Sequence, residues 1–318
     1  MSEIHKFLFD GLPLKGAIVR LDDSWQEVLR RRAANNQTGA YATPVAELLG
    51  EMLAAGCLMQ SAIKFNGALI LQMQSEGAVK LAVAEVQNDM AMRATATVQG
   101  EVAADANLPE LMPQGQCAVT LDPRDRLPGQ QPYQGVVALN HPDGEPLANL
   151  AQALRSYMAF SEQLDTYFVF AANEQVAAGI MLQRLPIKGS ANLESSLALS
   201  EEEMEEACRR IASHTLSLKR EELLQLDVET VLHRLYWEEK LLRFSSDGAA
   251  PRFACSCGRE RVANMLRNLG QAESESILAE RGDVEVGCDF CGAQYRFDAV
   301  DVGAIFNAAP GGWTETRQ

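Results

Sequence analysis

The sequence predicts an α+β protein with an N-terminal antiparallel sheet domain and packed helices, a helical linker and a small C-terminal domain. Three observations carry this prediction. Apolar and polar residues alternate in the strand manner between Phe65 and Gly100, the composition becomes rich in Gly, Ser and Asn after Pro186, and four cysteines lie close together near the C-terminus. The length of 318 residues also exceeds what one hydrophobic core usually fills.

The predicted domain boundaries follow these changes in composition. We expect an N-terminal α+β core domain over residues 1–186, an amphipathic helical linker over 187–250 and a C-terminal, cysteine-containing domain over 251–308. Residues 309–318 remain as a tail to which we assign no function. With 47% apolar residues, the chain has enough hydrophobic side chains to bury a sizeable core.

The N-terminal domain should begin with two strands and a short helix. Apolar residues alternate through HKFLFDG and KGAIVRL, which predicts the strands. Asp22 and Asp23 can then cap a helix that runs from Ser24 to about Ala34, because a short acidic side chain satisfies the free N–H groups of a first helical turn.

The strongest helix signal of the N-terminal half lies at Thr43. We expect Thr43 to be the N-cap, Pro44 to occupy the first turn and Glu47 to complete a capping box ahead of VAELLGEMLAAGCLMQSAIK. Apolar residues surround this segment almost completely. It should therefore form a central, buried helix.

Antiparallel strands should make up most of the remaining N-terminal domain. Between Phe65 and Gly100 three segments of period two are separated by short polar turns, which predicts a meander of NGALILQMQ, GAVKLAVAEV and MRATATVQG. Apolar residues at helical spacing predict a helix from Glu145 to Leu164. Further strands are expected at QCAVTLD and YQGVVAL before this helix, and at TYFVFAA and AAGIMLQRL after it.

Two amphipathic helices are predicted in the linker. Ser200 should cap the first, and the Glu residues that follow it suit the positive end of the helix dipole. The second should run through DVETVLHRLYWEEKLLRF. Neither is long enough to be stable alone in water, so both should depend on docking against the N-terminal domain. Their apolar stripes consist of Met204, Cys208, Ile211 and Leu218 in the first helix and Val228, Val231, Leu232, Leu235 and Trp237 in the second.

The C-terminal domain should be built on one clear helix, in GRERVANMLRNLG. Val262, Met265, Leu266 and Leu269 should face inward, and Gly270 should end the helix. A short helix in ESESILAERG and strands in DVEV and QYRFD should complete the domain. A segment of this size with so few large apolar side chains needs a further source of stability.

Four cysteines can supply that stability. Cys255 and Cys257 form a CxC pair, and Cys288 and Cys291 form a CxxC pair that is followed by Gly292. Four thiolates complete a tetrahedral structural zinc site, so one Zn²⁺ per chain is expected. Four buried thiols or two disulfides without a metal are the alternatives, but clustered cysteines in a cytosolic chain more often bind metal or perform redox chemistry.

Metal binding, redox state and folding should be coupled at this site. A zinc site holds its ligands as thiolates, which is the form that oxidants attack. Oxidation to the disulfides Cys255–Cys257 and Cys288–Cys291 would expel the ion, and loss of the ion should unfold the C-terminal domain. The positive side chains expected to soften the negative charge of the site are Arg252, Arg259 and Arg261.

Charge and composition exclude several classes of protein. The formal charge of −15 argues against nucleic-acid and anionic membrane partners, because both require clustered Lys and Arg. No apolar run has the length of a signal peptide or a membrane helix, so we expect a cytoplasmic protein. No nucleophile constellation is visible, and His141 with Asp143 fits turn chemistry, so we expect no enzymatic activity. The remaining cysteines, which should be buried packing residues, are Cys57, Cys117 and Cys208.

Three other functions fit parts of the pattern. A thiol-disulfide oxidoreductase would use CDFC, but such motifs usually open a helix after a strand, and this one precedes the strand-like QYRFD. A zinc module that binds nucleic acid would need a basic face. A purely structural zinc protein would carry the same four cysteines without a switch.

Several motifs match one known family. The CSC and CDFC pairs with their spacing and the run CGRERV are the most specific, and LLGEMLAAGCLM, IKFNGALILQMQ, YQGVV, SEQL and AAGIMLQRLP support them. Over nearly its whole length the chain resembles the bacterial heat-shock protein 33 family of redox-regulated holdase chaperones.

The resemblance implies a stress-response chaperone that works without ATP. In the reduced state it would be a largely inactive monomer with one Zn²⁺. In the oxidised state it would have released zinc, unfolded its C-terminal region and destabilised the linker helices, and would form a homodimer that holds unfolding client proteins. The zinc ligands and redox-active cysteines that the resemblance implies are Cys255, Cys257, Cys288 and Cys291.

Overall fold

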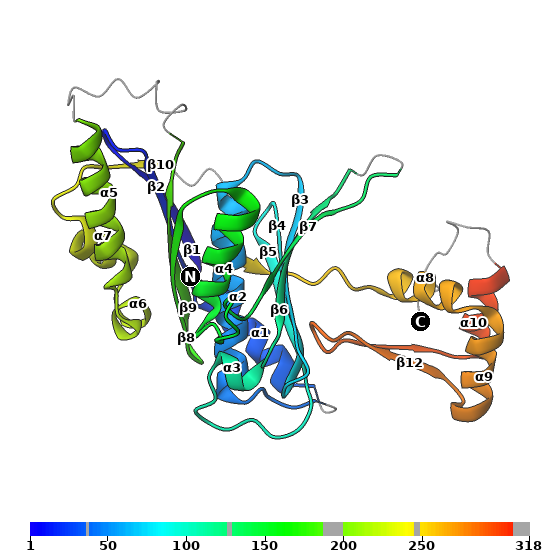
Figure 1. Ribbon diagram of the computed structural model, residues 1–318. Helices are drawn as coiled ribbons and strands as arrows, with labels where there is room; N and C mark the ends of the chain where they lie inside the picture. The colour runs from blue at the N-terminus through cyan, green and yellow to red at the C-terminus, as the bar shows by residue number, and fades with distance from the viewer. Residues whose placement is uncertain (36–37, 126–128, 187–199, 245–248, 308–318) are drawn as a thin grey trace.

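A computed structural model gives the structure of residues 1–35, 38–125, 129–186, 200–244 and 249–307. In these ranges the chain forms two large sheets, which lie on either side of a central helix (Figure 1). Further helices cover the outer face of the first sheet, and a small C-terminal unit lies beside the second sheet. This architecture confirms the predicted α+β class. The predicted tail and nearly all of the stretch PIKGSANLESS lie outside these residues.

The first sheet consists of β1 (Glu3–Phe9), β2 (Leu14–Leu21), β8 (Thr166–Ala172), β9 (Ala177–Arg184) and β10 (Leu241–Phe244). Its strands lie in the order β10-β1-β2-β9-β8, and each neighbouring pair is antiparallel. The four longer strands confirm the predictions. The residues of β10 were wrongly predicted to be helical: they pair with β1 because their backbone groups complete the open edge of the sheet.

The second sheet consists of β3 (Gly67–Gln74), β4 (Val79–Gln87), β5 (Ala91–Val98), β6 (Gln116–Pro123), β7 (Tyr133–Ala138) and β11 (Arg252–Phe253). Its order is β11-β5-β4-β3-β6-β7, so β3, β4 and β5 form the predicted meander. The short β11 runs parallel to β5 and was not predicted, because its pairing depends on residues far away in the sequence. It ties the start of the C-terminal region to the edge of this sheet.

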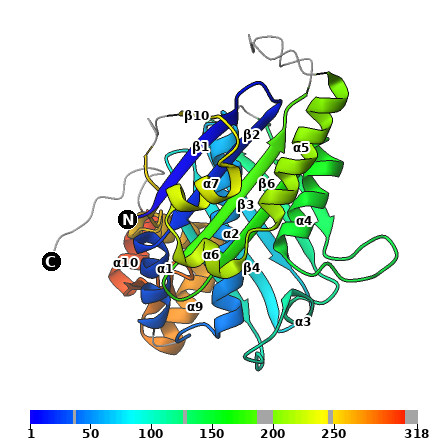
Figure 2. The same cartoon turned by 90° about the vertical axis from the view of Figure 1, so that its left-hand side faces the viewer.

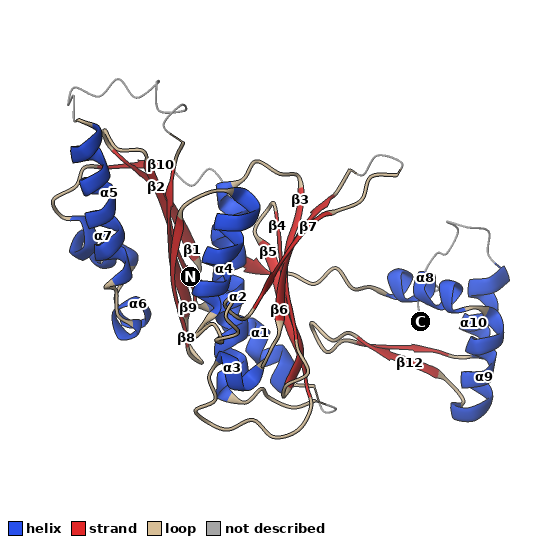
Figure 3. Ribbon diagram, viewed as in Figure 1, coloured by secondary structure: helices blue, strands red, loops and turns tan. Residues whose placement is uncertain are grey.

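The central helix α2 (Thr43–Ala62) lies between the two sheets and shares one core with both (Figure 3). It is buried as predicted, but its predicted cap is wrong. Ala42 is the N-cap, because its carbonyl accepts the N–H groups of Val45 and Ala46, and Thr43 already lies in the first turn. Within the described ranges every helix, α2 included, is too short or too polar to span a membrane.

Shorter helices pack beside this core. They are α1 (Asp23–Ala33), α3 (Leu108–Leu111) and α4 (Leu150–Tyr157), which continues as the π-helical turn η1 (Met158–Glu162). Asp22 caps α1 as predicted. The helix predicted from Glu145 begins only at Leu150, because the side chain of Asn149 accepts the N–H of Gln152 and so caps it there.

Three helices cover the outer face of the first sheet, namely α5 (Glu201–Leu216), α6 (Arg220–Gln225) and α7 (Val228–Tyr236) (Figure 2). Ser200 caps α5 as predicted and forms a capping box with Glu203. The two predicted stripes are buried or half-buried, except that Trp237 is 68% exposed because α7 ends before it. Arg20 of β2 donates hydrogen bonds to three carbonyls at the end of α6, which fixes that helix to the sheet.

Glu51 of α2 should make stability depend on pH. Burial raises the pKa of this carboxyl from its ordinary 4.5 to about 7, although Arg220 of α6 opposes the shift. Between these two pH values the unfolded chain loses a proton that the folded chain keeps, so the free energy of unfolding falls as pH rises. Glu51→Gln should therefore be more stable than the wild type at pH 8, by at most about 3 kcal/mol, and the difference should shrink towards pH 4.

Urea denaturation at a series of pH values measures this difference. Glu76→Gln is the matched control because the Glu76 side chain is 97% exposed, and its stability should follow the wild type at every pH. A Glu51→Gln profile that runs parallel to the wild type would refute the assignment.

The C-terminal unit has a small core of its own. It contains α8 (Arg259–Leu269), α9 (Gln271–Arg281), β12 (Val284–Gly287), β13 (Gln294–Phe297) and α10 (Ala299–Asn307). The predicted helices and the β12–β13 hairpin are confirmed, whereas α10 was not predicted. Val262 and Leu266 face the core as predicted, but Met265 and Leu269 are 46% and 49% exposed, because the core meets only the narrow face of α8 that also carries Ala263.

Candidate metal centre

The structure brings the four predicted cysteines together. Cys255 and Cys257 lie between β11 and α8, and Cys288 and Cys291 lie in the turn between β12 and β13. Their sulfur atoms all lie within 4.8 Å of one another. Two separations join the two motifs, with 3.2 Å from Cys257 to Cys291 and 3.6 Å from Cys255 to Cys288. All four are free thiols.

This spacing fits a tetrahedral metal site. Four sulfur atoms at the usual zinc–sulfur distance of about 2.3 Å lie about 3.8 Å from one another. The observed separations, from 3.2 Å to at most 4.8 Å, lie on both sides of that value. The cluster can therefore hold one metal ion after small movements of its side chains.

A tight turn shapes the CxxC half of the cluster. The N–H of Cys288 donates to the carbonyl of Ala293 at 2.9 Å, and the N–H of Gly292 donates to the carbonyl of Cys288 at 2.8 Å. Gly292 has a φ of 70°, in the left-handed region that favours glycine. This turn points the sulfurs of Cys288 and Cys291 to the same side of the hairpin.

Two side chains donate hydrogen bonds to the sulfurs. Arg93 of β5 donates to Cys255 Sγ at 3.8 Å, and the hydroxyl of Tyr295 in β13 donates to Cys257 Sγ at 3.1 Å. The hydrogen bond from Cys288 lowers the pKa of Cys255 to about 4, with a smaller contribution from Arg93. The same bond raises the pKa of Cys288. The hydrogen bond between the two sulfurs thus favours the thiolate form of Cys255 and the thiol form of Cys288.

The arginines that are nearest in sequence have partners outside the four sulfurs. Arg252 pairs with Asp89, Arg259 with Asp301, and Arg261 donates to Ser256. Arg93 was missed by the sequence analysis, because it lies 162 residues before Cys255 and nothing in its local pattern indicates the contact. Its position follows only from the pairing of β11 with β5.

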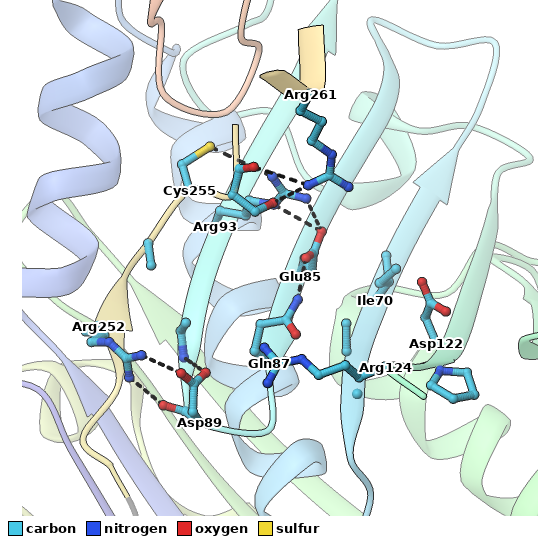
Figure 4. A pocket seen from close by; sticks show the side chains of 16 residues that line it. Ile70, Glu85, Gln87, Asp89, Arg93, Asp122, Arg124, Arg252, Cys255 and Arg261 are labelled. Carbon is cyan, nitrogen blue, oxygen red and sulfur yellow. Dashed lines mark hydrogen bonds and ion pairs between the residues drawn. The ribbon is translucent and has the colours of Figure 1, made fainter. Parts of the chain in front are cut away.

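The cluster can be reached from one side. Cys255 lines a pocket of about 880 Å³ between the second sheet and the segment that leads from β11 into α8 (Figure 4). Cys291, by contrast, is only 9% exposed. A small oxidant or a chelator in solution can therefore approach the sulfurs from the side of Cys255.

Other residues considered in the sequence take no part in this site. Cys57, Cys117 and Cys208 are buried, as predicted, and burial raises the pKa of Cys57 and Cys117 to about 12. These thiols are therefore packing residues. His141 and Asp143 lie in a turn, where the N–H of His141 donates to the Glu145 carbonyl and the carboxylate of Asp143 accepts the N–H of Glu145.

The fold and the cluster define a class of protein in which a small unit, with four cysteines that could hold a metal ion, is attached to a large α+β core. The comparison with protein families is specific: the model described as Hsp33 protein matches residues 2–298. The chain belongs to the Hsp33 family.

Individual relatives agree with this assignment. A 33 kDa chaperonin of Chromobacterium violaceum is 42% identical over 306 residues, which cover 96% of this chain and 94% of the relative. A 33 kDa chaperonin of Pseudomonas aeruginosa is 42% identical over 320 residues and covers 99% and 98% of the two chains. The crystal structure of the 33 kDa chaperonin from Thermotoga maritima has the same fold, with a TM-score of 0.72 at 20% identity over 95% of this chain and 97% of that one. Membership of this family supports a chaperone function.

Proposed function

We propose that this protein is a redox-regulated, ATP-independent holdase chaperone that acts in the cytoplasm under oxidative stress. One observation carries the proposal: four thiols converge on one point where the C-terminal unit meets the second sheet. A chemical change at the sulfurs must therefore affect the contact between the two parts. The family and the names of its members support the general class, a chaperone.

In the reduced protein, Cys255, Cys257, Cys288 and Cys291 would hold one Zn²⁺. Zinc is the metal that four thiolates in a tetrahedron most often bind, and when bound it supplies a cross-link between the two loops. In the part of the chain that the structure describes, the core of the C-terminal unit has only seven buried apolar residues. A structural zinc contributes about 10–16 kcal/mol to small metal-dependent folds, so this unit should depend on its ion.

Oxidation of the four thiolates to two disulfides removes four electrons. Two equivalents of hydrogen peroxide accept them, and four protons are taken up as four water molecules form. We propose the disulfides Cys255–Cys257 and Cys288–Cys291, because the two cysteines of each pair are close in sequence and so stay close to each other as the unit unfolds. A disulfide sulfur is a poor ligand, so the ion is released.

Unfolding of the C-terminal unit should then release the linker helices. These helices reach the unit through β10 and β11, which are separated by only a short stretch of chain. Their apolar faces and the outer face of the first sheet would become an exposed hydrophobic surface of the kind that binds unfolded chains. We propose that the reduced protein is a monomer and that the oxidised protein forms a homodimer which holds unfolding client proteins.

A thiol-disulfide oxidoreductase is the weaker alternative. Its reactive cysteine would need a helix N-terminus or a similar positive environment, whereas Cys288 lies in the turn of the β12–β13 hairpin. A purely structural metal site is the other alternative. It would keep the same four ligands but would leave the binding of clients independent of oxidation.

An oxidant titration tests the proposal. Hydrogen peroxide with mild heat should release one Zn²⁺ per chain, measured with a colorimetric chelator, and should suppress the light scattering of an aggregating client over the same range of oxidant. Reduction with dithiothreitol in the presence of Zn²⁺ should reverse both changes. Complete zinc release with unchanged client aggregation would favour the purely structural site, and turnover of a dithiol substrate would favour the oxidoreductase.

A further inference from the structure

Arg93 of β5 connects the cysteine cluster to the second sheet (Figure 4). Its guanidinium donates to Cys255 Sγ at 3.8 Å and forms an ion pair with Glu85 of β4 at 2.6 Å. It also lies over the ring of Phe290, 4.2 Å from the ring centre. Phe290 lies between Cys288 and Cys291, so one side chain contacts both halves of the cluster.

The neighbouring residue of β5 that faces the same side makes a second contact. The hydroxyl of Thr95 donates to the carbonyl of Asp289 at 2.9 Å. Asp289 and Phe290 are the two middle residues of the CxxC motif, and both rest on β5. The position of Cys288 and Cys291 therefore depends on the sheet as well as on their own hairpin.

The burial of Arg93 makes its charge partners important. The side chains of Arg93 and Glu85 are each only 13% exposed. A buried guanidinium is costly unless anionic or aromatic groups compensate it. Four thiolates around one Zn²⁺ carry a net charge of about −2, and two disulfides carry none. Oxidation would therefore remove one of the two anionic partners of Arg93 and leave the other, Glu85, in place.

We propose that Arg93 is a positioning residue that fixes the C-terminal unit on the second sheet as long as the cluster is negatively charged. It stabilises the thiolate form of Cys255 through its hydrogen bond to Sγ and holds the CxxC turn through Phe290. When the cluster loses its charge, this contact weakens and β11 separates from β5. The role of Arg93 in docking concerns the reduced protein alone. Only the weakening of this contact on oxidation rests on the proposed redox function.

Arg93→Ala and Arg93→Lys test the role of Arg93, and Arg252→Ala is the matched control. Arg252 also joins the C-terminal region to this sheet, through Asp89, but donates to no sulfur in the described structure. Competition with a chelator for Zn²⁺ should show about tenfold weaker binding in reduced Arg93→Ala, since residues that support metal ligands typically contribute 10–100-fold. Arg93→Lys keeps the charge and should recover most of the affinity, and Arg252→Ala should bind Zn²⁺ like the wild type.

Hydrogen exchange on the same reduced variants measures the docking. In Arg93→Ala the amides of residues 252–254 and 288–292 should exchange faster, whereas those of β3 and β6 should not change. Wild-type zinc affinity in Arg93→Ala would overturn the inference, and so would Arg93→Lys if it were as impaired as Arg93→Ala. Both readouts come from the reduced protein, so they remain decisive even if oxidation fails to activate the wild type, a result that would refute only the proposed function.

Discussion

Replacing Cys288 by serine should prevent the reduced protein from holding a metal ion and should unfold residues 251–307, β11 included, while the other strands of the two large sheets stay folded. The expected loss is large, because a structural zinc contributes about 10–16 kcal/mol to a small fold and the core of this unit is small. The N-terminal core does not depend on the unit, since α2 and both sheets share their own buried cluster. Zinc content by atomic spectroscopy and hydrogen exchange by mass spectrometry measure the two effects.

Cys208→Ala is the matched control for this variant. Cys208 is also a free thiol, but it lies on the buried face of α5, in the core that this helix shares with the first sheet. Its replacement should cost some stability of the linker helices and should leave one Zn²⁺ per chain. Normal zinc content in Cys288→Ser, with protection of residues 251–307 unchanged, would show that the four sulfurs are not a structural metal site.

The sequence predicted those parts of the fold that depend on local pattern. The meander of β3, β4 and β5 has period two over three successive segments, and the cap at Ser200 needs only the residues of its own first turn. β10 could not be predicted in this way. Its residues, Leu241–Phe244, continue a helical pattern, and only the free edge of β1 makes them a strand.

The candidate site could likewise be predicted only in part from the sequence. The spacing of the four cysteines indicates a metal site because each pair lies within one turn of chain, and the structure brings the pairs together. The residues around the sulfurs could not be predicted in this way, because Arg93 and Thr95 belong to a strand that lies far from the cysteines in the sequence. Of the arginines close to the cysteines in sequence, Arg252 and Arg259 form ion pairs with Asp89 and Asp301, and Arg261 donates to Ser256 within the CxC pair.

Weakening the docked helices should activate the protein without any oxidant. Ile211 of α5 is fully buried among the side chains of the first sheet and α7, in the cluster that includes Phe7, Leu232 and Tyr236. Ile211→Ala should destabilise the docking of these helices by about 2–5 kcal/mol, because it removes buried methyl groups and leaves a cavity. In the reduced state this variant should suppress the aggregation of an unfolding client, measured by light scattering, and should retain one Zn²⁺ per chain.

Leu216→Ala separates this effect from a general loss of hydrophobic residues. Leu216 lies on the same helix but is 49% exposed, so its truncation should leave client aggregation in the presence of the reduced protein the same as with the wild type. If Ile211→Ala retains its zinc and loses protection of α5 and α7 in hydrogen exchange, yet holds no client, the surface beneath these helices is not the binding surface. If the variant holds the client while its zinc is still bound, release of the metal and release of the helices are separate steps. The metal would then regulate the helices and take no direct part in holding the client.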